Sequence, residues 1–269
     1  MQTLSPSNFQ TLSGPIYFEL REQLITGIFE PGQRLKLNEL AEQTGTSVSP
    51  VREALIRLVA EDSVEMSSLR AFAVPNLSAA RFEQIVAMRL ALEGLAAERA
   101  AGQVSQVDLK KLSGLHDRFI DAEQGGHRSK AQALNRSFHF LVYECAKMPI
   151  LLSSISMLWA MMGPILRVYY SQSIPVKIGA PDHIKLMKAL RNGDAKDAAK
   201  AVSADIEHGC KSISEYISKI GKTQRCRLVN WSKKLVFLDS FSFKVLLRFS
   251  GHVSNLGRLT TLLATQDDP

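Results

Sequence analysis

The chain has 269 residues, of which 45% are hydrophobic and 22% charged, and its formal net charge is +7. This composition is typical of a soluble globular protein, and the length suits two domains better than one core. The charge is only weak support for a polyanionic partner, because residues 222–269 carry eight Lys and Arg against three Asp and so supply most of the excess.

The cysteines and apolar segments favour a cytoplasmic protein over a secreted or membrane-spanning one. Three widely separated cysteines with no CxxC pair are typical of reduced thiols: Cys145, Cys210 and Cys226. The first ten residues lack the basic start and apolar run of a secretion signal. Met148–Leu166 is uncharged and about long enough to cross a bilayer, but its serines and nearby prolines favour a buried bundle helix.

The first predicted helix begins near Pro15 and follows a polar, loose N-terminus over residues 1–12. Apolar residues recur at helical spacing from there, and Gly27 is the expected stop. The run Glu30-Pro31-Gly32 then indicates a turn.

Two short helices and a hairpin come next. The helices are expected over Asn38–Thr44 and from Ser49 to about Glu61, and the strands over Val64–Met66 and Phe72–Val74. Two helices joined by a tight turn and followed by a hairpin form a winged helix-turn-helix. Residues 13–76 are therefore predicted to be a DNA-binding domain.

The second of these helices has the features of a recognition helix. One side is apolar and is expected to face the core: Val51, Leu55, Leu58 and Val59. The other side points outward: Ser49, Arg52, Ile56 and Arg57. Ser49 is the expected N-cap and Pro50 the expected first residue, so the amides of the helix start can face a phosphate.

Arginines surround this helix start. Arg52, about one turn into the helix, is placed to reach a guanine edge, whereas Arg34 and Arg70 flank it and suit phosphate or minor-groove contacts. Each arginine taken alone is more simply a solvated surface charge. Their joint agreement with the helix-turn-helix pattern favours DNA binding.

The sequence after Asn76 is helical in period as far as about Ile220. Residues 79–220 are therefore predicted to form a separate, all-helical antiparallel bundle, which makes the fold class mostly α. Its first helix, Ala79–Ala101, carries Arg89 among apolar positions, one turn before Glu93. The basic segment 222–269 fits an added helix, a disordered arm or an unpacked tail equally well, and its charge is expected to add salt-sensitive DNA affinity.

The N-terminal motifs resemble the GntR family of transcription regulators. The matching runs are Pro31-Gly32-Gln33-Arg34-Leu35, Leu40-Ala41 and Ser47-Val48-Ser49-Pro50-Val51-Arg52-Glu53-Ala54-Leu55. This resemblance puts the family's DNA contacts on Arg34, Ser49, Arg52 and the wing at Arg70-Ala71, and the full candidate set is Arg34, Ser47, Ser49, Pro50, Arg52 and Arg70. The sequence departs from the family pattern at Val48, at Asp62-Ser63 and at Ala71, which implies altered operator preference.

Residues 79–220 resemble the FCD sensing domain of the FadR subfamily. The resemblance rests on Arg89-xxx-Glu93, Asn135-xxx-His139 and the run from His183 to Asp194. Domains of this type commonly bind a divalent metal through one Asp and three His. The resemblance implies the set Asn135, His139, His183 and Asp205, with Asn135 in the place of the usual Asp and Asp205 in that of a His.

Residue spacing agrees in part with a metal of the Zn, Ni or Mn class. Asn135 and His139 are four residues apart and share a helix face, and His183 and Asp205 lie at similar distances on either side of the turn at Gly193. His208 is an alternative ligand. The plainer interpretation is that both histidines are hydrogen-bonded core residues. Arg89 either pairs with Glu93 or, as the resemblance implies, holds an effector carboxylate.

The leading hypothesis is a homodimeric repressor that binds a near-palindromic operator and is released by a small organic acid. A regulator with a degenerate, metal-free sensor is the second hypothesis. A helical metalloenzyme is the third and weakest, because the sequence lacks HExxH, GxSxG and Walker motifs.

Overall fold

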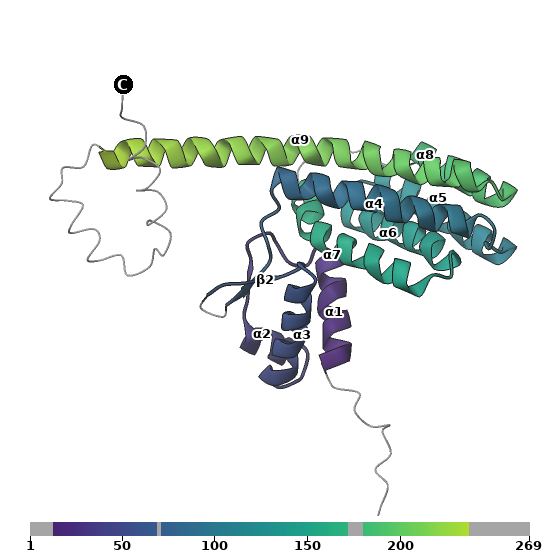
Figure 1. Ribbon diagram of the computed structural model, residues 1–269. Helices are drawn as coiled ribbons and strands as arrows, with labels where there is room; N and C mark the ends of the chain where they lie inside the picture. The colour runs from purple at the N-terminus through teal and green to yellow at the C-terminus, as the bar shows by residue number, and fades with distance from the viewer. Residues whose placement is uncertain (1–12, 69–70, 172–179, 237–269) are drawn as a thin grey trace, which may run out of the picture. The chain divides into compact units, whose positions relative to one another are not determined.

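The computed structural model describes residues 13–68, 71–171 and 180–236 (Figure 1). Internal contacts divide the chain into residues 1–218 and 219–269, and the first part holds both the DNA-binding helices and the helical bundle. Three sequence predictions lie outside the described residues: the loose N-terminus, the wing residue Arg70 and the tail beyond residue 236. The start of the basic tail is helical, because the last helix runs to Val236.

The N-terminal domain is a winged helix-turn-helix, as predicted. It consists of α1 (Ser13–Ile25), β1 (Arg34–Leu35), α2 (Leu37–Gln43), α3 (Val48–Ala60), β2 (Glu65–Met66) and β3 (Phe72–Ala73). The three strands form an antiparallel sheet in the order β1-β3-β2, with Arg34 and Glu65 both opposite Ala73. The β2–β3 hairpin was predicted from the sequence but β1 was not, because a two-residue strand has no alternation to detect.

The recognition helix α3 starts earlier than predicted. Its N-cap is Ser47, in extended conformation, and not Ser49, and the Ser47 side chain makes no capping hydrogen bond. Pro50 is therefore the third helical residue and not the first. This position tolerates proline, because the first four amides of an α-helix have no intrahelical partner and the missing N–H costs no bond.

The core of this domain forms where α1 meets α3. The periodicity correctly predicted that one side of α3 is buried, and Val51, Leu55 and Leu58 are each fully buried there. Leu20 and Leu24 from α1 face the same core. Burying each of these side chains contributes roughly 1.5–3 kcal/mol, which fixes α3 and leaves its opposite side exposed.

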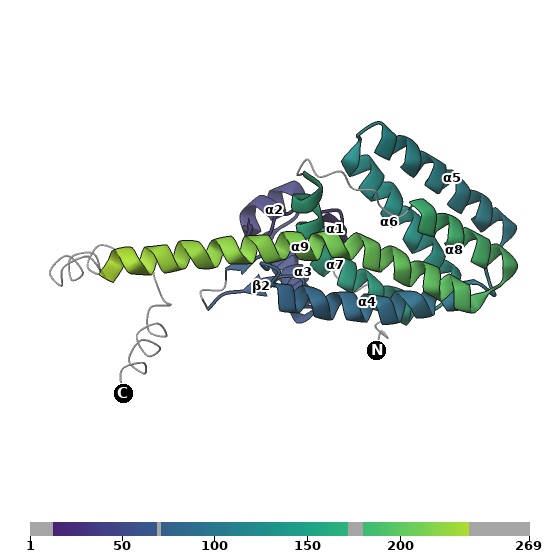
Figure 2. The same cartoon turned by 90° about the horizontal axis from the view of Figure 1, so that it is seen from above.

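Every described element after Ser78 is a helix, as predicted. The helices are α4 (Ala79–Ala100), α5 (Gln106–Gln124), α6 (Arg128–Cys145), α7 (Pro149–Ser171), α8 (Ala180–Asn192) and α9 (Ala195–Val236). Helix α6 packs against α4, α5 and α7, and α5 also packs against α8 (Figure 2). Gly193, in the left-handed region with φ +68°, reverses the chain between α8 and α9. The Asp194 carboxylate then accepts the amide of Asp197 and caps α9.

Helix α7 carries the apolar segment considered above. Pro149–Val168 is long and apolar enough to cross a membrane by length and composition, but such a test is also met by core helices of soluble proteins. In this fold α7 contacts α1, α4 and α6, and Leu158, Ala160 and Met162 are buried. It is therefore the core helix that the sequence predicted.

Helix α7 also docks α1 closely. Gly163 makes this approach possible, since an added Cβ would lie only 2.0 Å from the carbonyl oxygen of Leu24. The Arg21 guanidinium donates to the carbonyl of Ser153 at 2.8 Å, and Arg167 donates to the carbonyl of Gly27 at 2.9 Å. The DNA-binding helices thus reach the helical domain through α1.

Candidate DNA-binding surface and metal site

The exposed side of α3 and its start form the candidate DNA-binding surface. Ser47, Ser49 and Arg52 are exposed, and Arg34 is exposed on β1 nearby in the same small domain, whereas Pro50 is half-buried. Ile56 is also exposed one turn after Arg52, which gives this side an apolar contact group of the kind that suits a thymine methyl. Arg70, the predicted wing contact, lies outside the described residues.

Arg57 is exposed, as predicted, but it also has a partner within its own domain. Its guanidinium lies 3.9 Å from the centre of the Tyr17 ring. The Tyr17 hydroxyl donates to Glu61 at the end of α3 at 2.5 Å. Burial, and then this hydrogen bond, raises the pKa of Tyr17 to about 12. Arg57 and Tyr17 therefore fasten α3 to α1, and Arg52 is left as the exposed cation near the start of α3.

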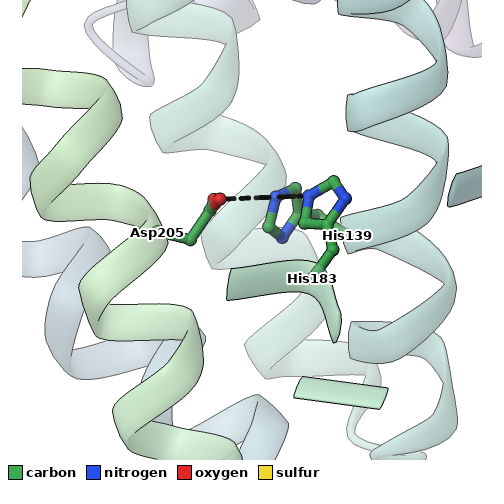
Figure 3. A group of neighbouring side chains, drawn as sticks. All are labelled: His139, His183 and Asp205. Carbon is green, nitrogen blue, oxygen red and sulfur yellow. Dashed lines mark hydrogen bonds and ion pairs between the residues drawn. The ribbon is translucent and has the colours of Figure 1, made fainter. Parts of the chain in front are cut away.

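Three of the four predicted metal ligands come together in the helical domain. His139 on α6, His183 on α8 and Asp205 on α9 are all buried, and one ligand atom from each lies within 4.8 Å of the others (Figure 3). His139 Nε2 is 3.0 Å from Asp205 Oδ2 and 3.3 Å from His183 Nε2. His183 Nε2 is 3.9 Å from Asp205 Oδ1. Figure 3 shows the carboxylate facing both rings.

Two buried side-chain oxygens on the helices that carry the cluster lack hydrogen-bond partners. One is Oδ1 of Asp205, and the other is Oδ1 of Asn135, one turn before His139 on α6. Buried oxygens normally accept a hydrogen bond, so the unpartnered Oδ1 of Asp205 beside two imidazoles is an arrangement that a cation satisfies. The donor set of two imidazoles, one carboxylate and one amide oxygen fits a borderline divalent metal, although the amide is the weakest donor.

Each of the two imidazoles has a partner at its Nδ1 atom, on the side away from the cluster, and this partner orients the ring. The Tyr143 hydroxyl donates to Glu93, so its oxygen is left to accept from His139 Nδ1, which is 3.3 Å away. A His139 that ligates a metal would carry its proton on Nδ1 and turn its Nε2 lone pair toward the cluster, whereas the present hydrogen bond to Asp205, at 3.0 Å, needs a proton on Nε2. His183 is held in the same way, with its Nδ1 3.4 Å from Nδ1 of His116 on α5.

Sequence reasoning missed His116, because nothing in its local pattern on α5 distinguishes it from a surface histidine. Its ring is buried and contacts the rings of His183 and Phe138. Phe138 also stacks on His183, with ring centres 3.9 Å apart. This apolar enclosure has an electrostatic consequence, because burial and then the neighbouring His139 lower the pKa of His183 to about 3. His183 is therefore neutral at physiological pH.

The carboxylate of Asp205 is ionised in this site. Burial alone would raise its pKa, but the attraction of His139, strengthened by their hydrogen bond, keeps the pKa of Asp205 below its ordinary value. His208, the alternative ligand considered above, is not part of the cluster. Its Nδ1 is instead 2.8 Å from a carboxylate oxygen of Asp182, and its side chain is 66% exposed.

Arg89 and Glu93 form a buried pair beside the histidines. Arg89 donates through Nε to one Glu93 oxygen at 2.6 Å and through Nη2 to the other at 3.2 Å. Trp159 Nε1 donates to the first oxygen at 3.0 Å, and Tyr143 donates to the second. Of the two alternatives for Arg89, this structure contains the pairing with Glu93. The contribution of Trp159 and Tyr143 was not foreseen.

Comparisons with known proteins agree with both domains. Residues 12–74 match the pattern of bacterial regulatory proteins of the gntR family, and residues 84–208 match the FCD domain. The transcriptional regulator McbR of Escherichia coli strain K12 is 34% identical over 192 residues, which are 70% of this chain and 86% of that protein. A probable repressor of a D-xylose utilisation operon from Paenarthrobacter nicotinovorans is 29% identical over 67% of this chain and 79% of its own length.

Solved structures lead to the same assignment. The structure of E. coli McbR/YncC superimposes with a TM-score of 0.71 at 29% identity, and the match covers 77% of this chain and 98% of that one. A regulator from Rhodococcus sp. RHA1 with 17% identity has a TM-score of 0.59, which shows the fold alone. The chain belongs to the GntR family of DNA-binding transcriptional regulators, which are not enzymes, and carries the FCD domain of the FadR subfamily.

Proposed function

We propose that the chain reads its operator through the front of α3, with Arg52 contacting a base edge in the major groove. The observation that carries this proposal is the burial of only one side of α3: Val51 and Leu55 are fully buried, whereas Arg52 is exposed. A helix held firmly on one side presents the other side in a fixed orientation. An arginine in that position can donate two parallel hydrogen bonds to guanine O6 and N7.

The remaining candidates have positioning roles in this proposal. Ser47, Ser49 and Pro50 form the start of α3, where free amides and the helix dipole favour a phosphate. Arg34 supplies a sequence-independent phosphate contact, and Arg70 is assigned the same role in the wing. One chain has one such helix, so we infer a homodimer that meets two half-sites of a near-palindromic operator in the cytoplasm.

We further propose that His139, His183 and Asp205, with Asn135, hold a divalent ion of the Zn, Ni or Mn class. The two orphaned oxygens and the facing Nε2 atoms support this assignment. When bound, the ion adds two positive charges to one carboxylate, and the resulting charge near +1 attracts a small organic acid. Binding of that acid is the proposed signal that releases the operator.

In this proposal Arg89 binds the effector carboxylate only if its pairing with Glu93 changes. Both oxygens of Glu93 already receive its guanidinium, so an effector carboxylate gains Arg89 only by displacing Glu93 or by sharing its donors. A metal held by His139, His183 and Asp205 would supply the positive charge that attracts the acid, and Arg89 would be a second partner of its carboxylate.

A metal-free sensor is the second candidate function of the helical domain. The observation in its favour is the composition of the ligand set, since Asn135 and Asp205 replace the Asp and the His that the FCD resemblance implies. An amide is a poor substitute for a carboxylate, and its loss of charge lowers metal affinity. Metal analysis of the purified protein separates the two candidates.

The experiment for the proposed function is a gel shift with the DNA that flanks the chain's own gene. It is repeated with a panel of carboxylic acids, with chelator and with the Asp205→Asn variant. We expect a specific complex that an acid dissociates in the wild type and not in Asp205→Asn. A complex that resists every acid while metal is bound contradicts the effector part, and the absence of any specific complex contradicts the whole proposal.

A further inference from the structure

Arginines from two other helices hold the C-terminal end of the recognition helix α3. Glu61 is the C-cap of α3, and Asp62 follows it in the left-handed region with φ +58°. Nε of Arg21 on α1 lies 3.8 Å from Oε2 of Glu61. Arg81 on α4 donates through Nη2 to the carbonyl of Asp62 at 2.6 Å. The end of a helix carries a partial negative charge, so it attracts both of these cations.

Arg21 also connects the end of α3 to α7. Its side chain is only 8% exposed, and its Nη2 donates to the carbonyl of Ser153 on α7 at 2.8 Å. Its Nε and the Oε2 of Glu61 are both buried and have no hydrogen-bond partner. These opposite charges attract each other across 3.8 Å without a hydrogen bond. A movement of α7 that carries Arg21 along therefore changes the attraction on the end of α3.

The two helices α4 and α7 are joined to each other beside the metal site. Trp159 on α7 donates to Glu93 on α4 at 3.0 Å, and Arg89 on α4 donates to the sulfur of Met162 on α7 at 3.4 Å. All four side chains are buried. A change in the pairing of Glu93 therefore acts on both helices whose contacts reach the end of α3.

The polar contacts at the end of α3 supply what its apolar core does not. Burial of Leu55 and Leu58 against α1 holds the two helices together, but the hydrophobic effect is not directional. Hydrogen bonds and ion pairs depend on the positions of single atoms. The contacts of Arg21 and Arg81 are therefore the ones that respond to a small shift of α4 or α7.

We propose that Arg21 and Arg81 are positioning residues for operator binding, through which the contact between α4 and α7 sets the orientation of α3. Neither arginine touches DNA in this proposal. The inference rests on the proposed role of α3 in reading the operator. Weakening the contact between α4 and α7 lowers specific affinity, because α3 loses its fixed orientation, and this loss is transmitted through the two arginines.

The test is a thermodynamic cycle of operator binding by the full chain, measured by fluorescence anisotropy. The DNA is a fragment that flanks the chain's own gene, with a scrambled fragment of equal length for non-specific binding. Trp159→Phe removes the donor that joins α7 to Glu93 and keeps an aromatic ring. Arg21→Met/Arg81→Met removes both positioning residues, and Arg99→Met removes an exposed arginine of α4 as the matched control.

Circular dichroism verifies that each protein is folded at the temperature of the titration. Should Arg21→Met/Arg81→Met fail to fold, Arg21→Lys/Arg81→Lys takes its place. Lysine keeps the charge but lacks the planar fork with which one guanidinium holds two partners.

We expect Trp159→Phe to weaken specific binding roughly three- to tenfold in the wild type, and less than twofold in the protein that lacks both arginines. The double arginine variant itself is expected to lose about tenfold in specific affinity, with the slope of log affinity against log salt concentration unchanged. Arg99→Met is expected to bind like the wild type.

Three results overturn the inference. One is a loss from Trp159→Phe that is absent, or is equal in both backgrounds. Another is an unchanged specific affinity of the double arginine variant. The third is a salt slope that falls by one unit or more in that variant, which places the arginines on the DNA backbone instead.

Arg52→Ala, titrated alongside, separates this inference from the proposed function. If Arg52→Ala loses specific binding while the double arginine variant keeps it, only this inference fails. If Arg52→Ala keeps specific binding, the proposed role of α3 fails and the inference fails with it.

Discussion

Replacing Glu93 by Gln tests the buried network at the centre of the sensing domain. Each Glu93 oxygen accepts two hydrogen bonds: one from Arg89 and Trp159, the other from Arg89 and Tyr143. An amide NH₂ in either position faces two donors and leaves the buried Arg89 without a counter-charge. Breaking a buried ion pair from one side costs about 3–5 kcal/mol, and the full burial of Glu93 puts this site in that range.

The assay is thermal and denaturant unfolding followed by circular dichroism. For a protein of this size the loss corresponds to a fall in melting temperature of about 6–20 °C. Glu98→Gln, an exposed glutamate on the same helix, is the control and is expected to stay within about 0.5 kcal/mol of the wild type. The double variant Arg89→Met/Glu93→Gln is expected to lose less than the sum of the single variants. A Glu93→Gln protein as stable as Glu98→Gln refutes the reasoning.

Three further predictions follow from the metal site, the domain contact and the recognition helix. Zn²⁺, Ni²⁺ or Mn²⁺ at a hundredfold excess over its Kd is expected to raise the free energy of unfolding of the wild type by about 2.7 kcal/mol. Chelator is expected to reverse this stabilisation and Asp205→Asn to abolish it. Unfolding curves that are identical with and without metal contradict the site. Gly163→Ala is expected to destabilise the protein by about 1–3 kcal/mol in the same unfolding assay, because the added Cβ would meet the Leu24 carbonyl. The control Gly114→Ala is expected to be neutral or stabilising, because nothing lies within 4 Å of its added Cβ. Val48→Arg is expected to raise operator affinity and to steepen the slope of log affinity against log salt concentration by about one unit. An unchanged slope in anisotropy titrations argues against a phosphate near that position.

The sequence predicts the parts of this fold that depend on local periodicity. The buried face of α3 follows from the spacing of Val51, Leu55 and Leu58, and the absence of described strands after residue 78 follows from uninterrupted helical period. The approach of His183 to Asp205 was predicted from their similar distances along the chain on either side of the turn at Gly193. Local signals were less informative at element ends, since Ser47 and Ser49 are equally good caps by residue type.

Contacts between distant parts of the chain could not be predicted in this way. Tyr143 and Trp159 reach Glu93 across 50 and 66 residues, and no local pattern marks either of them. The position of His116 against His183 depends on how α5 packs on α8. The close contact of Gly163 with α1 likewise depends on packing between the domains, so a glycine in a long apolar helix gave no sign of it.

The base contact assigned to Arg52 is the central claim, and the ratio of specific to non-specific DNA affinity measures it most directly. Fluorescence anisotropy gives this ratio when each protein is titrated with a fragment flanking the chain's own gene and with a scrambled fragment of equal length. The proteins are the wild type, Arg52→Ala and the control Arg118→Ala, which removes an exposed arginine of α5. We predict that Arg52→Ala loses about 1–3 kcal/mol of specific binding and keeps most of its affinity for the scrambled fragment, whereas the control retains both. An unchanged ratio in Arg52→Ala would contradict the account.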